Sequence, residues 1–439
     1  MATAPENEVV IDTDEWNKPT FLRRVCIRGY KSIAFCDVTL EPLTILVGRN
    51  ASGKSNFLDA LAFLRDCVKS GVSEAVRLRG NMQSLLCRSV ESNALTFEIE
   101  TSFTAGATLS EHEARYRLNI PAVHVADVLT HGEPEESVTI KELPTGRQRR
   151  FECLGPPPKK LRVFSGPIEP GTNVPPTDTM PWPIASGQLM FNYLAQSPDI
   201  EWADCLRRMT FYNFIPEAMR RLQRPNPGQL LDQHGQNLAS VLAGTRQYDD
   251  WAFKRVGSYL SAVVPGVERF DVVRYGDYET VHFWLESNRP DKKLAFDASS
   301  MSDGTLRVLA ALTAAFQSLL PWGCPTVVGI EEPETALHPA AMRALVAALD
   351  EATLRTQILL TTHSPDLLDA AEIKPANVRV VQMIDGQTVI GKVDEASVEI
   401  VQRELNSLGG LERENQLEPD LDDQDRQKAM AQGRQEDRP

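Results

Sequence analysis

The N-terminal hydrophobic pattern predicts a strand, a loop and a helix in succession. Two strand-like apolar runs, Leu22 to Ile27 and Leu43 to Val47, precede a glycine-bearing loop. After that loop, apolar side chains recur at helical spacing at Phe57, Leu58, Leu61, Leu64 and Val68. This spacing is typical of a helix that buries one face against a sheet.

The middle of the chain changes its pattern twice. From about residue 94 to 153, apolar and polar residues alternate, which predicts an antiparallel β lobe. Nine prolines then fall among the 28 residues from Pro156 to Pro183, too many missing N–H donors for a packed sheet or helix. Helical patterns resume from Gly187 to about Val264, and strand patterns follow at 270–273 and 281–285.

The last third alternates helices and strands, which predicts an α/β sheet. An apolar helix at Leu306–Leu320, a buried strand at Thr326–Ile330, a helix at Ala340–Asp350 and a strand starting at Gln357 follow one another. We therefore predict seven segments: 1–20, a flexible N-terminus; 21–93, the first half of the core; 94–155, the β-rich lobe; 156–186, an exposed Pro-rich loop; 187–265, a helical subdomain; 266–410, the second half of the core; and 411–439, a disordered acidic, Gln-rich tail.

Composition is that of an ordinary globular protein, with 42% apolar and 24% charged residues. The net charge of −14 argues against a wholly basic nucleic-acid-binding surface, and the seven scattered cysteines predict reduced thiols. The N-terminus lacks the features of a secretory signal, so we expect a cytoplasmic protein. The uncharged stretch Val308–Ile330 is long enough for a membrane span, but its polar and turn residues favour a helix, a turn and a strand.

The strongest chemical signal is a glycine-rich loop between the second strand and the first helix. The run Gly48-Arg49-Asn50-Ala51-Ser52-Gly53-Lys54-Ser55 fits G-x-x-x-x-G-K-[ST], and Asn56 follows it. Such a loop points successive backbone N–H groups and a helix N-terminus at a polyphosphate. We expect Lys54 to reach the β- and γ-phosphates of ATP and Ser55 to ligate Mg²⁺.

Two further strands end in polar residues and should deliver them to the edge of the sheet where this loop lies. Glu331 and Glu332 follow the apolar run Thr326–Ile330. The first is placed to hold Mg²⁺ and the second to activate the attacking water. His363 ends the next strand, where it would sense a γ-phosphate. Ser302-Asp303-Gly304-Thr305 precedes an apolar helix and has two readings, an ordinary N-cap and a phosphate-facing helix end.

Together these segments resemble the ABC-type P-loop ATPases of the SMC, RecF and OLD group. The loop at Gly48–Ser55 looks like their Walker A motif, Ser302-Asp303-Gly304 like the signature, Ile330–Glu334 like Walker B and His363 like the switch histidine. Phe21–Ser32 resembles the family's first strand, and Asp232–Leu238 resembles a helix start before the signature. For the Q-loop, which supplies a further Mg²⁺ contact, Gln83 is the candidate, with an exposed loop glutamine as the alternative.

The resemblance implies an α/β ATPase head, with an antiparallel β lobe and a helical insertion, that uses ATP and Mg²⁺. It also implies a homodimer or higher homo-oligomer in which the signature of one copy closes on the nucleotide of the other. Glu331 replaces the usual aspartate and Ser302–Thr305 departs from Ser-Gly-Gly-Gln, as in small prokaryotic relatives. No sustained heptads predict the coiled coil of SMC proteins, and no strand pattern predicts the nuclease of OLD proteins.

Two functional classes remain open at this stage. In the first, the ATPase regulates a separately encoded effector, a nuclease or toxin, in prokaryotic anti-phage defence. In the second, it resembles RecF or SMC proteins in DNA repair or chromosome maintenance and binds DNA directly. The basic clusters at 147–150, 159–162 and 220–224 would serve nucleic acid, although such runs are more often solvated faces. Neither class involves a membrane.

Overall fold

The computed structural model describes residues 21–105, 110–143, 145–153, 160–166, 176–181, 189–191, 202–286, 294–317 and 324–432. In this part of the chain, a six-stranded sheet forms the centre of the molecule, in the order β11-β15-β16-β3-β17-β18. Its strands are β3 (Leu43–Val47), β11 (Thr210–Tyr212), β15 (Val327–Glu331), β16 (Gln357–Thr362), β17 (Val378–Ile384) and β18 (Gln387–Lys392). All neighbouring pairs are parallel except β17 with β18.

The central strands are apolar on both sides because both faces of the sheet are covered. Within β3, Leu46 packs into one hydrophobic core, whereas Ile45 and Val47 pack into the other. Successive side chains of a strand point to opposite faces, so a continuous apolar run is what two covered faces require. The strand bounds predicted at Leu43–Val47 are confirmed.

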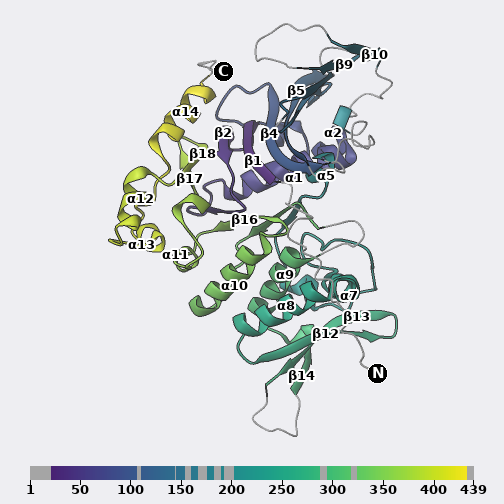
Figure 1. Ribbon diagram of the computed structural model, residues 1–439, viewed down its shortest axis with the longest axis vertical. Helices are drawn as coiled ribbons and strands as arrows, with labels where there is room; N and C mark the ends of the chain where they lie inside the picture. The colour runs from purple at the N-terminus through teal and green to yellow at the C-terminus, as the bar shows by residue number, and fades with distance from the viewer. Residues whose placement is uncertain are drawn as a thin grey trace, which may run out of the picture.

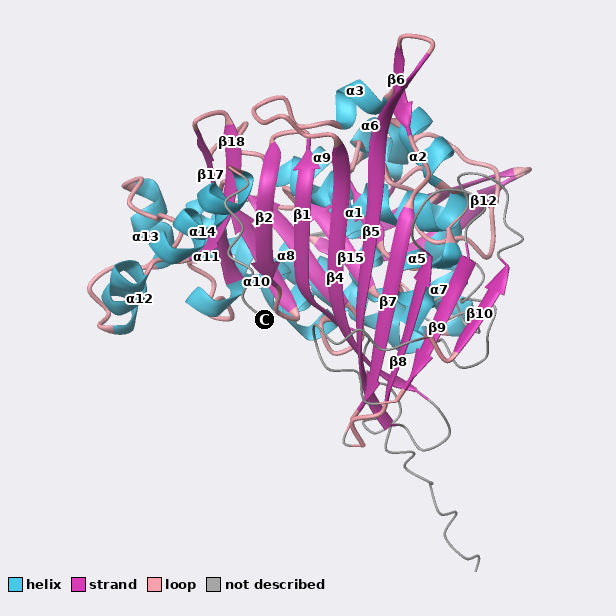
Figure 2. Ribbon diagram, turned by 90° about the horizontal axis from the view of Figure 1, so that it is seen from above, coloured by secondary structure: helices cyan, strands magenta, loops and turns pink. Residues whose placement is uncertain are grey.

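One face of the central sheet is covered by helix α1 (Lys54–Ser70) and a large antiparallel sheet, seen broadside in Figure 2. The described strands of this second sheet run in the order β10-β9-β8-β7-β5-β4-β1-β2, with β6 paired to β5. They are β1 (Phe21–Tyr30), β2 (Ile33–Thr39), β4 (Ala94–Ala105), β5 (Ser110–Val125), β6 (Val128–His131), β7 (Glu135–Glu142), β8 (Gln148–Cys153), β9 (Lys160–Ser165) and β10 (Asp178–Pro181). Short helices α2 (Val72–Leu78), α3 (Met82–Leu85) and α5 (Trp202–Arg207) complete this layer.

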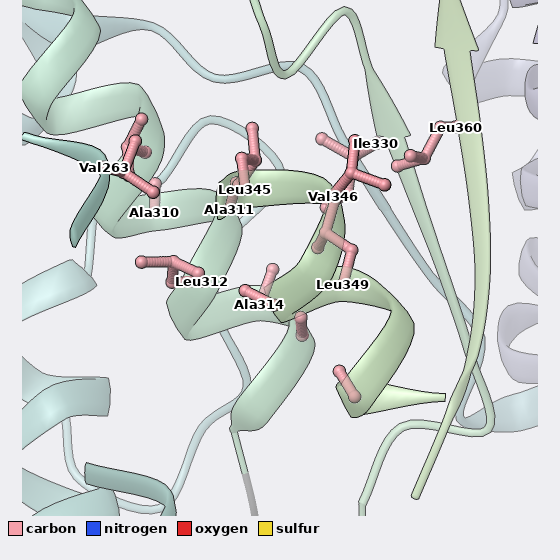
Figure 3. Packing of buried hydrophobic residues seen from close by; sticks show 14 of the residues in the cluster. Val263, Ala310, Ala311, Leu312, Ala314, Ile330, Leu345, Val346, Leu349 and Leu360 are labelled. Atoms are coloured by element: carbon pink, nitrogen blue, oxygen red, sulfur yellow. The ribbon is translucent and has the colours of Figure 1, made fainter. Parts of the chain in front are cut away.

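The other face of the central sheet is covered by helices, which lie in the lower half of Figure 1. These are α6 (Pro216–Arg220), α7 (Leu238–Tyr248), α8 (Asp250–Val263), α9 (Asp303–Phe316) and α10 (Pro339–Ala352). Figure 3 shows aliphatic side chains of α9 and α10 in this core, with Val346 of α10 next to Ile330 of the sheet. A small sheet lies beyond them, formed by β12 (Val267–Tyr275), β13 (Tyr278–Leu285) and β14 (Leu294–Asp297), with the 3₁₀ helix η2 at Ala298–Ser300.

The C-terminal residues are helical, and the prediction of a disordered tail from residue 411 is wrong for the part that the structure describes. After the 3₁₀ helix η3 (Pro375–Asn377) and strands β17 and β18, the chain forms α12 (Glu395–Gln402), α13 (Leu408–Arg413) and α14 (Leu421–Ala431), while α11 (Pro365–Leu368) follows β16. Polar contacts hold α14 in place: Gln427 donates to Ile390 O at 2.6 Å, and Arg426 pairs with Asp37. A polar helix without a strong apolar face therefore docks through side-chain amides and charges, which periodicity does not reveal.

Three other predicted boundaries also differ from the structure. The β-rich segment 94–155 does form antiparallel strands, but its boundary differs, because β4 pairs with β1 and the two predicted segments share one sheet. The predicted Pro-rich loop contains β9 and β10, which pair in antiparallel register, and most of its other residues lie outside the described part. The predicted helical subdomain contains β11, an edge strand of the central sheet. The N-terminal residues 1–20 lie outside the described chain.

Candidate functional site

The glycine-rich loop joins the carboxyl end of β3 to the start of α1, as predicted. Gly53 is the N-cap of α1 and has φ +108°, in the region that favours glycine. A Cβ at Gly53 would lie 1.9 Å from Oγ1 of Thr388, and one at Gly48 would lie 2.1 Å from the carbonyl oxygen of Val381. Both glycines are therefore required, because the loop packs directly against the backbone and side chains of β17 and β18.

A chain of hydroxyl groups holds the loop from outside. Thr388 Oγ1 donates to Ser52 O at 3.0 Å and lies 2.6 Å from Ser32 Oγ. Asn56 Nδ2 donates to Ser32 Oγ at 2.6 Å. The predicted nucleotide-binding residue Asn56 thus points toward the β1–β2 turn, and sequence reasoning missed the supporting role of Thr388, which follows the loop by more than 300 residues.

Lys54 is the buried cation of the loop, with 5% of the residue exposed. Its ammonium donates to Gly48 O at 2.6 Å and to Arg49 O at 3.0 Å. Burial lowers the pKa of Lys54, while the carboxylates of the site oppose that shift, Glu332 most strongly. A desolvated ammonium at the helix N-terminus is suited to bind a phosphate group.

The Ser55 hydroxyl and the first carboxylate meet, as predicted. Ser55 Oγ donates to Glu331 Oε2 at 2.7 Å, and Glu331 ends β15, two strands from β3 in the sheet. Carboxylate and hydroxyl oxygens are ligands that Mg²⁺ accepts together with waters and phosphate oxygens. No group of three or more His, Cys, Asp or Glu that could hold a metal occurs in the described residues. The donor set fits a Mg²⁺ ion held jointly by protein and nucleotide.

The second carboxylate contacts the predicted switch histidine. His363 Nδ1 lies 3.2 Å from Glu332 Oε1, and both side chains are partly exposed. Glu332 has φ +42°, an uncommon conformation for a non-glycine residue, and its N–H donates to Thr361 O at 3.0 Å. The parallel register of β15 and β16 sets Glu331 opposite Thr361 and so brings Glu332 and His363 to one edge.

Glu334 connects the loops that carry these two residues. It is buried, and Thr362 Oγ1 donates to Glu334 Oε1 at 2.5 Å. Burial raises the pKa of Glu334, an effect that this hydrogen bond opposes. Sequence analysis treated Glu334 only as part of a motif, whereas the structure shows that it positions the strand ends of β15 and β16 relative to each other.

The signature segment caps α9. Ser302 Oγ accepts from the Thr305 N–H at 3.2 Å, so the N-cap reading is confirmed. Asp303 pairs with Arg220 of α6. A Cβ at Gly304 would lie 2.7 Å from Ala336 O, so this glycine allows the loop after β15 to pack against α9. None of the hydrogen bonds or ion pairs described for this segment reaches the glycine-rich loop.

None of the hydrogen bonds or ion pairs described for the chain joins Gln83, the Q-loop candidate, to another predicted site residue. Gln83 lies exposed in α3, which contacts β6. Asn213 follows β11, whose Tyr212 pairs with Ile330 immediately before Glu331, so the chain after β11 starts at the strand ends that carry the site. In the sequence, β11 is a short apolar run that ends at Tyr212, and it lies inside the segment that was predicted to be helical.

These features define the protein as an ABC-type P-loop ATPase head of the SMC, RecF and OLD group. A family model described as "AAA domain, putative AbiEii toxin, Type IV TA system" matches residues 43–143 and 237–369, more than half of the chain. The chain belongs to this family. The matched ranges contain the glycine-rich loop, the signature segment, Glu331, Glu332 and His363.

Two curated relatives and one solved structure are similar to parts of the chain. The DNA replication and repair protein RecF of Arthrobacter sp. (strain FB24) is 28% identical over 146 residues, 30% of this chain and 34% of that protein. RecF of Gloeobacter violaceus is 36% identical over 89 residues, 20% of this chain and 24% of its own length. The chain thus matches about a third of the first relative's length and a quarter of the second's.

The solved structure shares the fold. A crystal structure of the Smc head domain from Pyrococcus furiosus, bound to the C-terminal domain of ScpA, superposes with a TM-score of 0.50 at 12% identity and covers 88% of this chain and 99% of that one. The predicted fold class, an α/β ATPase head with an antiparallel β lobe and a helical insertion, is confirmed. Within the described residues, no helix is both long and apolar enough to cross a membrane. The described part of the uncharged stretch Val308–Ile330 contains most of α9 and of β15.

Proposed function

We propose that this protein binds ATP with Mg²⁺ and hydrolyses it in a site shared between two copies of the chain. The observation that carries the proposal is the convergence of Lys54, the Ser55–Glu331 contact and the Glu332–His363 contact at one edge of the central sheet. Phosphoryl transfer needs positioning and charge stabilisation more than covalent chemistry, and these groups provide both.

The roles of the residues follow from their placement. The loop N–H groups and Lys54 bind the phosphates, and Ser55 with Glu331 would hold Mg²⁺, which neutralises charge on the phosphate oxygens. Glu332 accepts the proton of the attacking water. His363 orients the Glu332 carboxylate through its 3.2 Å contact and lies where a γ-phosphate would be detected.

The proposal of a dimer rests on the signature segment. Ser302 and Gly304 lie at the N-terminus of α9, a 14-residue helix, which favours an anion. Asp303 is 53% exposed, and no described contact joins this segment to the glycine-rich loop of the same chain. A second copy would therefore supply the nucleotide that this helix end faces.

Light scattering combined with phosphate release tests the ATPase proposal. The purified protein should release phosphate from ATP only with Mg²⁺, and its mass should double when ATP is bound. A protein that splits ATP while remaining a monomer would refute the shared site, and one that releases no phosphate would refute hydrolysis.

For the biological role, we propose that the ATPase regulates a separately encoded effector, a nuclease or toxin, in prokaryotic anti-phage defence. The family description names a toxin of a type IV TA system, which supports an effector-linked role. The alternative, direct action on DNA in repair, is favoured by the relatives named as DNA replication and repair proteins. Of the basic clusters, Arg150 pairs with Glu152 and Arg220 with Asp303, so part of their charge is compensated.

DNA binding distinguishes these roles. Affinity for duplex DNA that falls steeply with added salt would favour the repair role, because phosphate contacts release counterions. Absence of such binding, together with co-purification of the product of a neighbouring toxin or nuclease gene, would favour the effector role. We expect the second result.

A further inference from the structure

The segment Leu408–Gln416, here called the bridging segment, packs against α11, the short helix that begins two residues after His363. Gly409 of α13 packs so closely on α11 that a Cβ there would lie 2.2 Å from Pro365 O. The Gly409 N–H donates to Asp369 Oδ1 at 3.0 Å, and Arg413 donates to Asp369 Oδ2 at 3.1 Å. Figure 1 shows α11 and α13 next to each other. One end of the bridging segment is thus held by α11, close in sequence to His363.

The other end of the bridging segment contacts the glycine-rich loop. Arg49, the second residue of that loop, donates to Asn415 Oδ1 through Nη2 at 2.8 Å and through Nε at 3.2 Å. Two donors of one guanidinium on a single acceptor give this contact a defined geometry. The bridging segment therefore spans the two elements that the proposed function assigns to the γ-phosphate.

Between these two attachments, the bridging segment carries Glu412, which is partly buried. Burial raises the pKa of Glu412, while Lys54, Arg49 and His363 act on it in the opposite direction. Burial lowers the pKa of Lys54, and the Glu332 and Glu412 carboxylates both oppose that shift. The Asn415 N–H donates to Glu412 O at 3.0 Å, so Glu412 lies one turn before the residue that accepts from Arg49 of the glycine-rich loop.

We propose that Glu412 sets the discrimination of this site between ATP and ADP, because its carboxylate competes with the γ-phosphate for Lys54 and His363. The inference rests on the proposed function, namely nucleotide binding at the glycine-rich loop. With ADP, the Glu412 carboxylate has no phosphate to compete with at this place, whereas the γ-phosphate of ATP brings a second anion that the carboxylate would repel. Glu412 is part of the bridging segment, which contacts Arg49 at one end and α11 at the other. A displacement of Glu412 therefore also moves this segment.

Equilibrium binding of labelled nucleotides with Mg²⁺ tests the proposal on the full chain. For Glu412→Gln, we expect affinity for a non-hydrolysable ATP analogue to rise about tenfold and affinity for ADP to change less than about twofold, since one repulsion across a partly exposed site is removed. Glu414→Gln is the matched control, because it removes the same charge from an exposed position whose side chain contacts Asn406. Its affinities should equal those of the wild type.

Other outcomes separate the inference from the function on which it rests. Equal gains for ATP analogue and ADP would overturn the proposal, because they would show a general charge effect. Weaker binding of the analogue would also overturn it, because Glu412 would then assist the nucleotide. Unaltered analogue binding by Lys54→Ala would instead refute the proposed nucleotide site. The thermal unfolding midpoint without nucleotide should be the same for Glu412→Gln and the wild type, which confirms that the fold is retained.

Discussion

Replacement of Glu332 by glutamine tests the chemistry of the site most directly. Gln keeps the size of the side chain and a group able to hydrogen-bond His363, but it cannot accept the proton of the attacking water. The backbone should stay in place, because the Glu332 N–H is held by Thr361 O at 3.0 Å and this bond does not involve the side chain. The side chain is 37% exposed, so its replacement removes little packing.

The expected magnitude follows from the role of a general base. Such a group contributes roughly 10²- to 10⁴-fold to the rate, which corresponds to about 3–5 kcal/mol of transition-state stabilisation. ATP affinity should change little, because Lys54 and the loop N–H groups bind the phosphates. Glu331→Gln is the contrasting variant, because it weakens the 2.7 Å contact with Ser55 and should raise the Mg²⁺ concentration needed for activity.

Phosphate release and light scattering with ATP and Mg²⁺ separate the outcomes. Glu332→Gln should bind ATP, fail to split it and accumulate as an ATP-held dimer. Hydrolysis at the wild-type rate would show that the wrong carboxylate has been assigned. Loss of hydrolysis without any gain in ATP-dependent association would count against the shared site and leave the assignment of Glu332 intact.

Three further predictions concern the loop and the signature. Lys54→Ala should abolish binding of a labelled ATP analogue, because the lost ammonium faces phosphate; circular dichroism should show that the fold is retained. Ser302→Arg should bind ATP as a monomer but not turn it over, and mixing it with Lys54→Ala should restore some phosphate release, because a mixed dimer keeps one intact site. If both variants dimerise and the mixture stays inactive, the in-trans arrangement is wrong. Gly53→Ala should lower the free energy of unfolding by about 1–3 kcal/mol and impair ATP binding, because φ is +108° and the Cβ would lie 1.9 Å from Thr388 Oγ1; denaturant unfolding measures the first effect, and unchanged stability would show that the loop tolerates a side chain.

Local motifs were predictable from the sequence where residue types and their spacing indicate a particular structure or chemistry. The glycine-rich loop between Val47 and Lys54, the strand that ends in Glu331 and the N-cap at Ser302 were all read from residue types and spacing. Gln83 was predicted as the Q-loop residue only from its position along the chain. It lies in α3, whereas Asn213, in a run too short to show a period, follows the strand next to β15.

By itself, the sequence determined the fold class, the phosphate-binding loop and the order of the polar strand ends, because each depends on residues within about ten positions of one another. Only the tertiary structure decided which distant residues complete the site. Thr388 contacts the glycine-rich loop, Glu334 contacts Thr362, and Asn415 contacts Arg49. These residues come from elements brought together by the order of strands in the central sheet and by the docking of α13 on α11. Single hydrogen bonds between distant polar residues leave no periodic trace in the chain, so their partners appear only when the sheets and helices pack.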